Sequence, residues 1–173
     1  MKRILTLLLC SLFVMALPVY AAVDLAQLQI MVRALGFLNN PPTGDLNVGI
    51  VYSPGIPGSA EEASALEAEL GSGLQVGDLF LKPVMVNIND VDNANVGLFF
   101  LTKDLGTDGR KILAASKKKQ ILCVTTDVAQ VTNGSCGLGI VSQPKIQILV
   151  NHSVASSSGA TFATVFSMMI TEY

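Results

Sequence analysis

The chain reads LNVGIVY over residues 46–52, SPGIPG over 53–58 and SAEEASALEAEL over 59–70. The first stretch is a nearly continuous apolar run, which is typical of a buried strand, and the second is a rigid turn rich in glycine and proline. Ser59 is followed three positions later by Glu62, as a capping box requires, so we expect a helix over 60–70. A strand, a tight connection and a helix in this order indicate a crossover to a parallel strand.

The same alternation extends in both directions along the chain. We expect a helix over 25–37 that is capped by Asp24, a second over 110–118, and strands over 80–88, 96–101 and 120–125. A polar, glycine-rich stretch over 71–77 is expected to be a loop, and 127–131 a turn or half-helix. Helical crossovers between strands favour a mostly parallel sheet with helices on both faces.

The last third of the chain departs from this pattern. Strands over 136–142 and 145–150 are separated only by Gln143-Pro144, which predicts an antiparallel hairpin. A final helical region begins at Asn151 or Ser153, breaks near Gly159 and resumes over 160–170. We therefore predict an α/β fold: a mostly parallel, three-layer sheet with helices on both faces and an antiparallel hairpin at its edge.

The first 21 residues have the pattern of a secretory signal peptide. Lys2 and Arg3 precede an apolar run over 4–17, and Val19-Tyr20-Ala21 offers small residues at the cleavage positions. The run is shorter than the roughly 20 residues of a membrane span. Cys10 is not expected to be a lipoprotein cysteine, because the bulky Leu9 precedes it. We predict cleavage after Ala21, a periplasmic location, and one domain over 22–173, with an uncleaved anchor as the alternative.

Composition limits the partners of that domain. The whole chain has a formal net charge of −2, and the predicted signal segment removes two cations, so the exported part is more acidic still. Binding to nucleic acid favours a basic face, so nucleic acid is not an expected partner.

Two cysteines, Cys123 and Cys136, remain after the predicted cleavage. An oxidising compartment favours a disulfide between them. A loop of this length would be stabilised by about 3 kcal/mol. Two buried free thiols are the alternative, and zinc is not expected because two thiols and a distant histidine do not supply four ligands.

The sequence offers little catalytic chemistry. His152 is the one histidine, and no serine lies in a Gly-x-Ser-x-Gly elbow. Asp90 and Asp92 would start a calcium loop only if a glycine and a glutamate followed at its sixth and twelfth places, where this chain has Asn95 and Leu101. We therefore expect a protein that is not an enzyme and that holds no metal or cofactor.

Two segments are candidate binding surfaces. The turn after the strand over 46–52 precedes a helix N-terminus, where free backbone N–H groups bind anions. A candidate ligand pocket there contains Tyr52, Ser53, Gly55, Gly58 and Ser59, near the strand ends at Leu101 and Thr125; a purely structural turn is the alternative. A candidate partner surface contains Phe166, Met168 and Met169, because the last predicted helix has more apolar surface than one stripe needs; core packing is the alternative.

Several segments resemble the YfiR-like family of periplasmic proteins. The stretch QILCVTTD over 120–127 is similar to a strand of that family, and GLGIV over 137–141 and IQILVN over 146–151 follow in the family's order. Ala155 and Gly159 match a helix with a glycine, Asn40-Pro41 stands where the family often has Trp-Pro, and the strand over 46–52 matches in place. The resemblance covers roughly residues 26–169.

This resemblance implies regulation rather than catalysis. A YfiR protein binds the periplasmic sensor domain of a membrane-bound diguanylate cyclase and represses it, and such proteins form dimers. The chain is therefore expected to bind an inner-membrane sensor protein such as a diguanylate cyclase, with a homodimer as a candidate assembly. A redox-sensitive bond between Cys123 and Cys136 would be a candidate switch. The alternative is a small-ligand-binding periplasmic domain of transport type, which the parallel sheet and the turn over 53–58 favour.

Overall fold

The computed structural model describes residues 25–142 and 144–173. The helices are α1 (Leu25–Leu35), α2 (Ser59–Leu70), α3 (Gly109–Lys119), α4 (Val128–Thr132) and α5 (His152–Ser157), with 3-10 turns η1 (Gly106–Asp108) and η2 (Thr164–Met168). The strands are β1 (Gly44–Tyr52), β2 (Leu74–Val76), β3 (Leu79–Asn87), β4 (Leu98–Leu101), β5 (Cys123–Thr125), β6 (Leu138–Val141), β7 (Gln147–Val150) and β8 (Thr171–Glu172). The predicted signal peptide, its cleavage site and the Asp24 cap lie outside the described residues.

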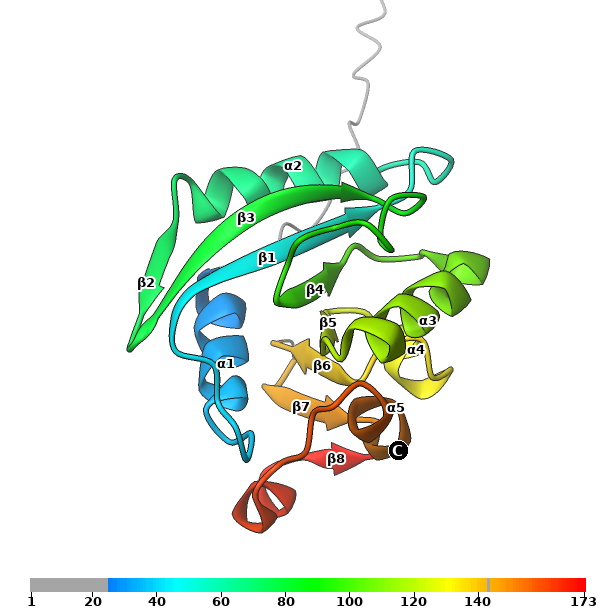
Figure 1. The fold of residues 1–173 in the computed structure, drawn as a ribbon. Coiled ribbons are helices and arrows are strands. Elements are labelled where there is room, and N and C mark those ends of the chain that lie inside the picture. The colour runs from blue at the N-terminus through cyan, green and yellow to red at the C-terminus, as the bar shows by residue number, and fades with distance from the viewer. Residues whose placement is uncertain (1–24, 143) are drawn as a thin grey trace, which may run out of the picture.

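The strands of the described chain form a single sheet in the order β2-β3-β1-β4-β5-β6-β7-β8 (Figure 1). The neighbours from β3 through β1, β4 and β5 to β6 are parallel, whereas β2 pairs with β3 and β7 with β6 in the antiparallel sense. The predicted α/β class with a mostly parallel sheet is therefore confirmed.

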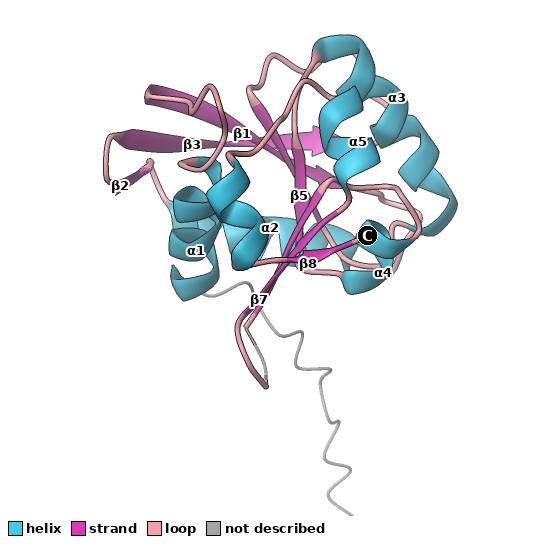
Figure 2. Cartoon of the chain, turned by 90° about the horizontal axis from the view of Figure 1, so that it is seen from below, coloured by secondary structure: helices cyan, strands magenta, loops and turns pink. Residues whose placement is uncertain are grey.

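Helices cover both faces of this sheet. Figures 1 and 2 show α1 on one side of the sheet and α3 on the other. Alternate residues of β1 point to opposite faces, so Val48 and Ile50 lie in a core shared with α1 and α2, and Val51 lies in a second core shared with α3. Burial on both faces explains why β1 and β4 are almost uninterrupted apolar runs.

Two short strands were missed by the sequence prediction. β2 lies inside the predicted loop over 71–77 and pairs with β3. β8 pairs with the outer side of β7, so the predicted hairpin β6–β7 is real but does not form the sheet edge. Strands of two or three residues are too short to show an alternating hydrophobic pattern.

The predicted helix over 160–170 is wrong. The backbone of this segment is bound to the chain that follows α1: Asn39 N–H donates to the Thr161 carbonyl (2.9 Å) and Ala163 N–H donates to the Phe37 carbonyl (2.8 Å). These bonds hold 161–163 extended, and only the turn η2 follows. The phenyl ring of Phe166 stacks on both Phe37 and Phe162, with ring centroids 4.9 Å apart in each pair.

The candidate partner surface therefore needs a correction. Phe166 is fully buried and belongs to the core, whereas the exposed fraction is 82% for Met168 and 49% for Met169. Only the two methionines of the predicted surface are available to a partner.

Candidate functional site

The order of the strands identifies one place where ligands are expected to bind. From β1 the chain crosses through α2 to β3 on one side, and the next strand, β4, lies on the other side of β1. The direction of winding thus reverses between β1 and β4. In open α/β sheets, ligands bind outside the carboxyl ends of the strands at such a switch point. Here those ends are followed by Ser53 and Thr102.

A chain of hydroxyl groups joins the two strand ends to α2. Ser59 Oγ accepts the Ser53 N–H at 3.0 Å and lies 2.7 Å from Thr102 Oγ1. Thr102 Oγ1 donates to the Val51 carbonyl at 3.1 Å, so its single proton is used there and Ser59 is the donor between the two hydroxyls. Ser53 Oγ donates to Asp108 Oδ2 at 3.1 Å. These contacts fix the first residue of α2 against β1 and β4.

The predicted capping box does not form. The N-cap residue of α2 is Gly58, at φ 81°, a left-handed conformation that suits glycine. The Ser59 hydroxyl faces Ser53 and Thr102 instead. The Glu62 side chain accepts the N–H of Lys103, the second residue after β4, at 2.9 Å through Oε2. Glu62 therefore belongs to the switch point rather than to the helix cap.

Glu62 is a buried carboxyl group with one oxygen unused. Its side chain is almost entirely enclosed, and Oε1 has no hydrogen-bond partner in the structure. Burial raises the pKa of Glu62 above its ordinary value; the N–H and charge of Lys103 oppose this, and the nearby Asp104 and Asp127 carboxylates add to it. A buried acceptor without a donor is costly, so such a group in a native structure calls for a partner.

The end of β5 completes the polar edge. Asp127 caps α4 by accepting the Ala129 N–H at 2.8 Å, and its other oxygen accepts the Asp104 N–H at 3.2 Å. The buried Gln130 accepts from Thr125 Oγ1 at 2.7 Å and donates to the Thr102 carbonyl at 2.8 Å. These bonds tie the loops after β4 and β5 together.

A second unpartnered group lies at the same edge. Thr126, directly after β5, has a buried hydroxyl without a hydrogen-bond partner. Asp104, after β4, has φ 57°, a left-handed conformation that aspartate tolerates better than most residues. Carboxylates and hydroxyls from three loops thus converge on one edge of the sheet. Such a set favours a ligand group that donates hydrogen bonds and carries positive charge.

The predicted pocket residues belong to this site only in part. Ser53 and Ser59 are buried and belong to the chain of hydroxyl groups. Tyr52 at the end of β1 and Gly58 are half-buried, and Gly55 is exposed in the turn. Glu62, Thr102, Thr126, Asp127 and Gln130 were missed. Four of them follow the carboxyl end of β4 or β5, which is the signal that could have located them.

The disulfide prediction is confirmed. Cys123 and Cys136 are bonded, with their Cα atoms 5.1 Å apart, and both are buried in the core beneath α3. The bond closes the loop that contains Thr126, Asp127 and α4. It therefore anchors both ends of one wall of the candidate site.

The other residues considered from the sequence have local partners. His152 Nε2 lies 3.1 Å from Glu172 Oε1, and the bond to His152 lowers the pKa of this exposed carboxylate. Asp92 pairs with Lys118 at 3.7 Å. Within residues 25–142 and 144–173, no cluster of histidine, cysteine and acidic side chains is arranged to hold a metal ion. Across the same residues, no helix has the length and apolar character needed to cross a membrane.

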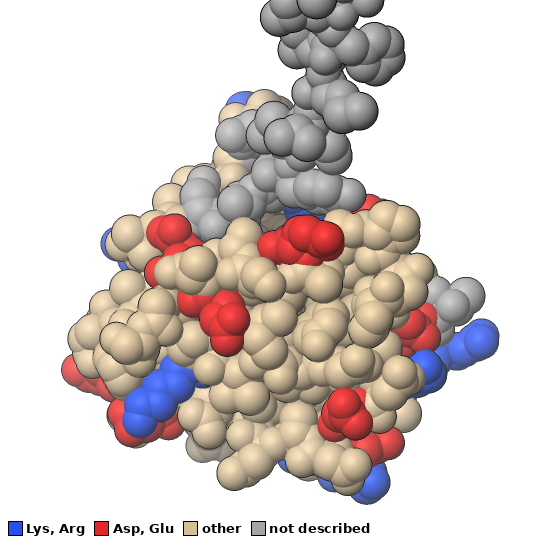
Figure 3. Space-filling model, turned by 90° about the horizontal axis from the view of Figure 1, so that it is seen from above, with Lys and Arg blue, Asp and Glu red and all other residues tan. Residues whose placement is uncertain are grey.

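The surface charge agrees with the composition. Figure 3 views the molecule from the α2 side and shows acidic side chains spread over this face, with few basic ones near its margins. The described residues visible on this face form no basic patch of the kind that attracts a phosphate backbone.

The fold is similar to that of several solved structures. The chain matches the ABC domain in complex with L-Trp from Streptococcus pneumonia with a TM-score of 0.57, 13% identity and 83% coverage of this chain. It matches a substrate-binding protein with adhesive properties from Clostridium difficile, in a ligand-free, open structure, with a TM-score of 0.61, 10% identity and 89% coverage. A conserved domain protein from Vibrio cholerae gives a TM-score of 0.59, 12% identity and 87% coverage.

These similarities establish the α/β fold. The chain spans 59–60% of the length of those three proteins. No protein-family model matches the chain, and a search of curated proteins likewise finds no match.

Proposed function

We propose that this protein is a non-catalytic, exported domain that binds a small molecule at the switch point between β1 and β4. The observation that carries the proposal is the unpartnered, buried Glu62 Oε1 at the place where this type of sheet binds ligands. The hydroxyl of Thr126 is a second donor or acceptor left for the ligand. One structural neighbour is a substrate-binding protein, and another was solved in complex with L-Trp. Both similarities support the binding of a small molecule.

The charges of the site suggest which group of the ligand binds there. Burial raises the pKa of Glu62, and the charges of Asp104 and Asp127 raise it further, whereas the N–H and the charge of Lys103 oppose the shift. A ligand ammonium group would donate to Glu62 Oε1 and compensate the surplus negative charge. Free amino acids and small amines are therefore the first ligands to test.

The test is a thermal-shift screen of the purified protein with free L-amino acids and small amines. A ligand that binds only the native state raises the melting temperature as its concentration rises. The matched control is the N-acetylated form of each active amino acid, which lacks the ammonium group and should give no shift. A screen without any concentration-dependent shift would count against the proposal.

A second candidate function is regulation of an inner-membrane sensor, such as a diguanylate cyclase. The large exposed fractions of Met168 and Met169 favour a protein partner, because methionine is common at such surfaces. Its test is the level of intracellular cyclic diguanylate in a strain that lacks the gene, complemented with the wild type or with Met168→Glu. A repressor predicts a rise that only the wild type reverses; an unchanged level would remove this candidate.

A further inference from the structure

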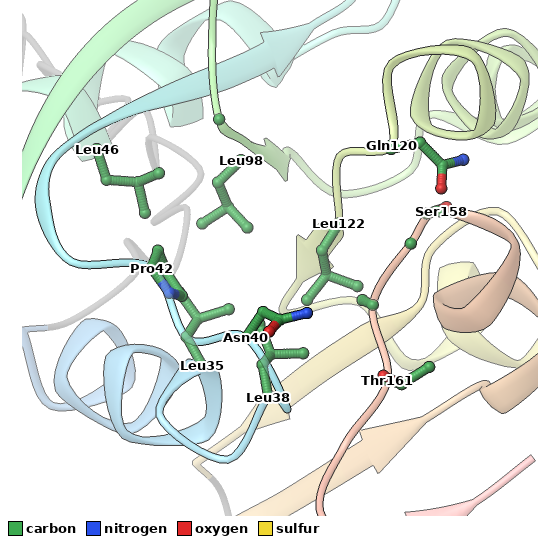
Figure 4. Close-up of a pocket in the computed structure, with 13 residues that line it drawn as sticks. Leu35, Leu38, Asn40, Pro42, Leu46, Leu98, Gln120, Leu122, Ser158 and Thr161 are labelled. Atoms are coloured by element: carbon green, nitrogen blue, oxygen red, sulfur yellow. The ribbon is translucent and has the colours of Figure 1, made fainter.

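A cavity of about 170 Å³ lies at the opposite edge of the sheet from the switch point. Its apolar wall consists of Leu46 near the start of β1, Leu98 at the start of β4 and Leu122 before β5. These side chains face Leu35 at the end of α1 and Leu38 in the segment after it. Figure 4 shows these side chains directed toward a common space. The switch-point residues do not line this cavity.

Residues without side chains keep this space open. Gly97 and Gly159 both line the cavity. A Cβ atom on Gly97 would lie 2.7 Å from Leu46 Cδ1, and Gly159 has φ +77°, where other residues are strained. Larger residues at these two positions would clash or strain the chain. At Gly159 the backbone conformation itself disfavours a larger residue, whereas at Gly97 a larger residue would push the Leu46 side chain toward the cavity.

The lining also contains a few polar groups and no charged one. Asn40 and Gln120 are at the rim (Figure 4), and Ser158 contributes a buried hydroxyl that has no hydrogen-bond partner. The Ser158 hydroxyl can rotate about χ1 toward a guest. A charged guest would lose its hydration without gaining a counter-charge, so the lining selects against ions.

We propose that this cavity is a second ligand site, which takes a neutral molecule the size of one ring with a single hydrogen-bonding group. An engineered leucine-lined cavity of about 150 Å³ in another protein binds benzene, so the volume here is sufficient for such a ring. Apolar pockets with a few placed polar groups are the usual form of small-molecule sites. The apolar part of the guest packs against Leu98 and Leu122, and its polar group bonds to Ser158 or Asn40.

The test uses phenol as the probe and the purified protein with labelled leucine methyl groups. Nuclear magnetic resonance titration should give saturable shifts of the Leu98 and Leu122 methyl signals. Benzoate, which has a similar ring and a charge, should bind at least tenfold more weakly. Leu122→Phe, which fills the cavity, should weaken phenol binding at least tenfold, and Leu38→Phe is the second filling variant if Leu122→Phe does not fold.

The control variant is Ser64→Ala, at an exposed position of α2 that does not line the cavity, which should bind phenol as the wild type does. The proposal is overturned if phenol gives no saturable shift, if its shifts arise away from these leucines, or if the folded filling variants bind it unchanged. Equal binding of phenol and benzoate would also overturn it, because the uncharged lining is what should separate them.

Discussion

Ser59 Oγ lies 2.7 Å from Thr102 Oγ1, and this hydrogen bond joins α2, the helix that follows β1, to the residue directly after β4. The two residues are 43 positions apart in the sequence. They meet at the point where the sheet reverses its winding, and the contact fixes the start of α2, which carries Glu62, against β1 and β4.

Replacing Ser59 should therefore destabilise the fold. Ser59→Ala removes the acceptor for the Ser53 N–H and the donor to Thr102, both buried, at a cost of about 1–3 kcal/mol. Urea unfolding of the wild type and of Ser59→Ala measures this difference in the free energy of unfolding. Ser64→Ala, at an exposed position of the same helix, is the matched control and should change stability by less than about 0.5 kcal/mol. Equal effects of both variants would refute the role of Ser59.

Glu62 should make stability fall as the pH rises. Burial raises the pKa of Glu62 in the folded state, so the folded protein holds a proton that the unfolded chain releases near the ordinary glutamate pKa of 4.5. Stability from this group is complete below that value and is lost as the pH rises through the raised pKa. Glu62→Gln should thus gain stability over the wild type as the pH increases.

Thermal unfolding from acid to neutral pH measures this difference. Glu69→Gln, at an exposed position of α2, is the control and should follow the wild type. A constant difference between Glu62→Gln and the wild type at every pH would show that Glu62 does not titrate abnormally.

The disulfide should be structural and resistant to reductant. The sequence separation of 13 residues between Cys123 and Cys136 predicts a loss of about 3 kcal/mol when both are replaced by alanine. Because both sulfurs are buried, a mild reductant should reach them only when the protein opens. Thiol labelling after reduction, under native and under denaturing conditions, shows whether the reductant reaches the disulfide in the folded protein or only after unfolding. Rapid native reduction with the fold intact would instead favour a redox switch.

The aromatic stack should contribute strongly to stability. Phe166→Ala removes a ring that is fully buried between Phe37 and Phe162, which should cost about 3–5 kcal/mol. Met168→Ala, two residues later and largely exposed, should be nearly neutral. Denaturant unfolding compares the two variants, and a small effect of Phe166→Ala would mean that the segment after α5 is not packed as described.

The sequence was sufficient for the parts of the fold that depend on local patterns. The runs that became β1 and β4 are apolar because both of their faces are buried, and glycine and proline mark the turn after β1. The prediction failed where contacts between distant residues determine the structure. Ser59 and Glu62 fit a local capping box, but their side chains bond to Ser53, Thr102 and Lys103 instead. No local sequence pattern shows that these distant partners replace the bonds of the cap.

The same reasoning explains the errors near the C-terminus. The apolar residues around Phe166 resemble a buried helix, but Thr161 and Ala163 form backbone hydrogen bonds with the chain after α1, which excludes helical bonding there. The pocket was predicted to lie near the ends of β1, β4 and β5, but only residues of the segment over 52–59 were named for it. The residues after β4 and β5 take part through hydrogen bonds between distant loops, such as Gln130 to the Thr102 carbonyl, and no local pattern shows these bonds.

The most direct test of ligand binding at the switch point is calorimetric titration of the wild type and Glu62→Gln with the amino acid or amine that gives the largest thermal shift. We predict that Glu62→Gln binds at least tenfold more weakly, which corresponds to a loss of about 1.4 kcal/mol, while Glu69→Gln binds as the wild type does. Equal affinity of the wild type and a folded Glu62→Gln variant would contradict the account.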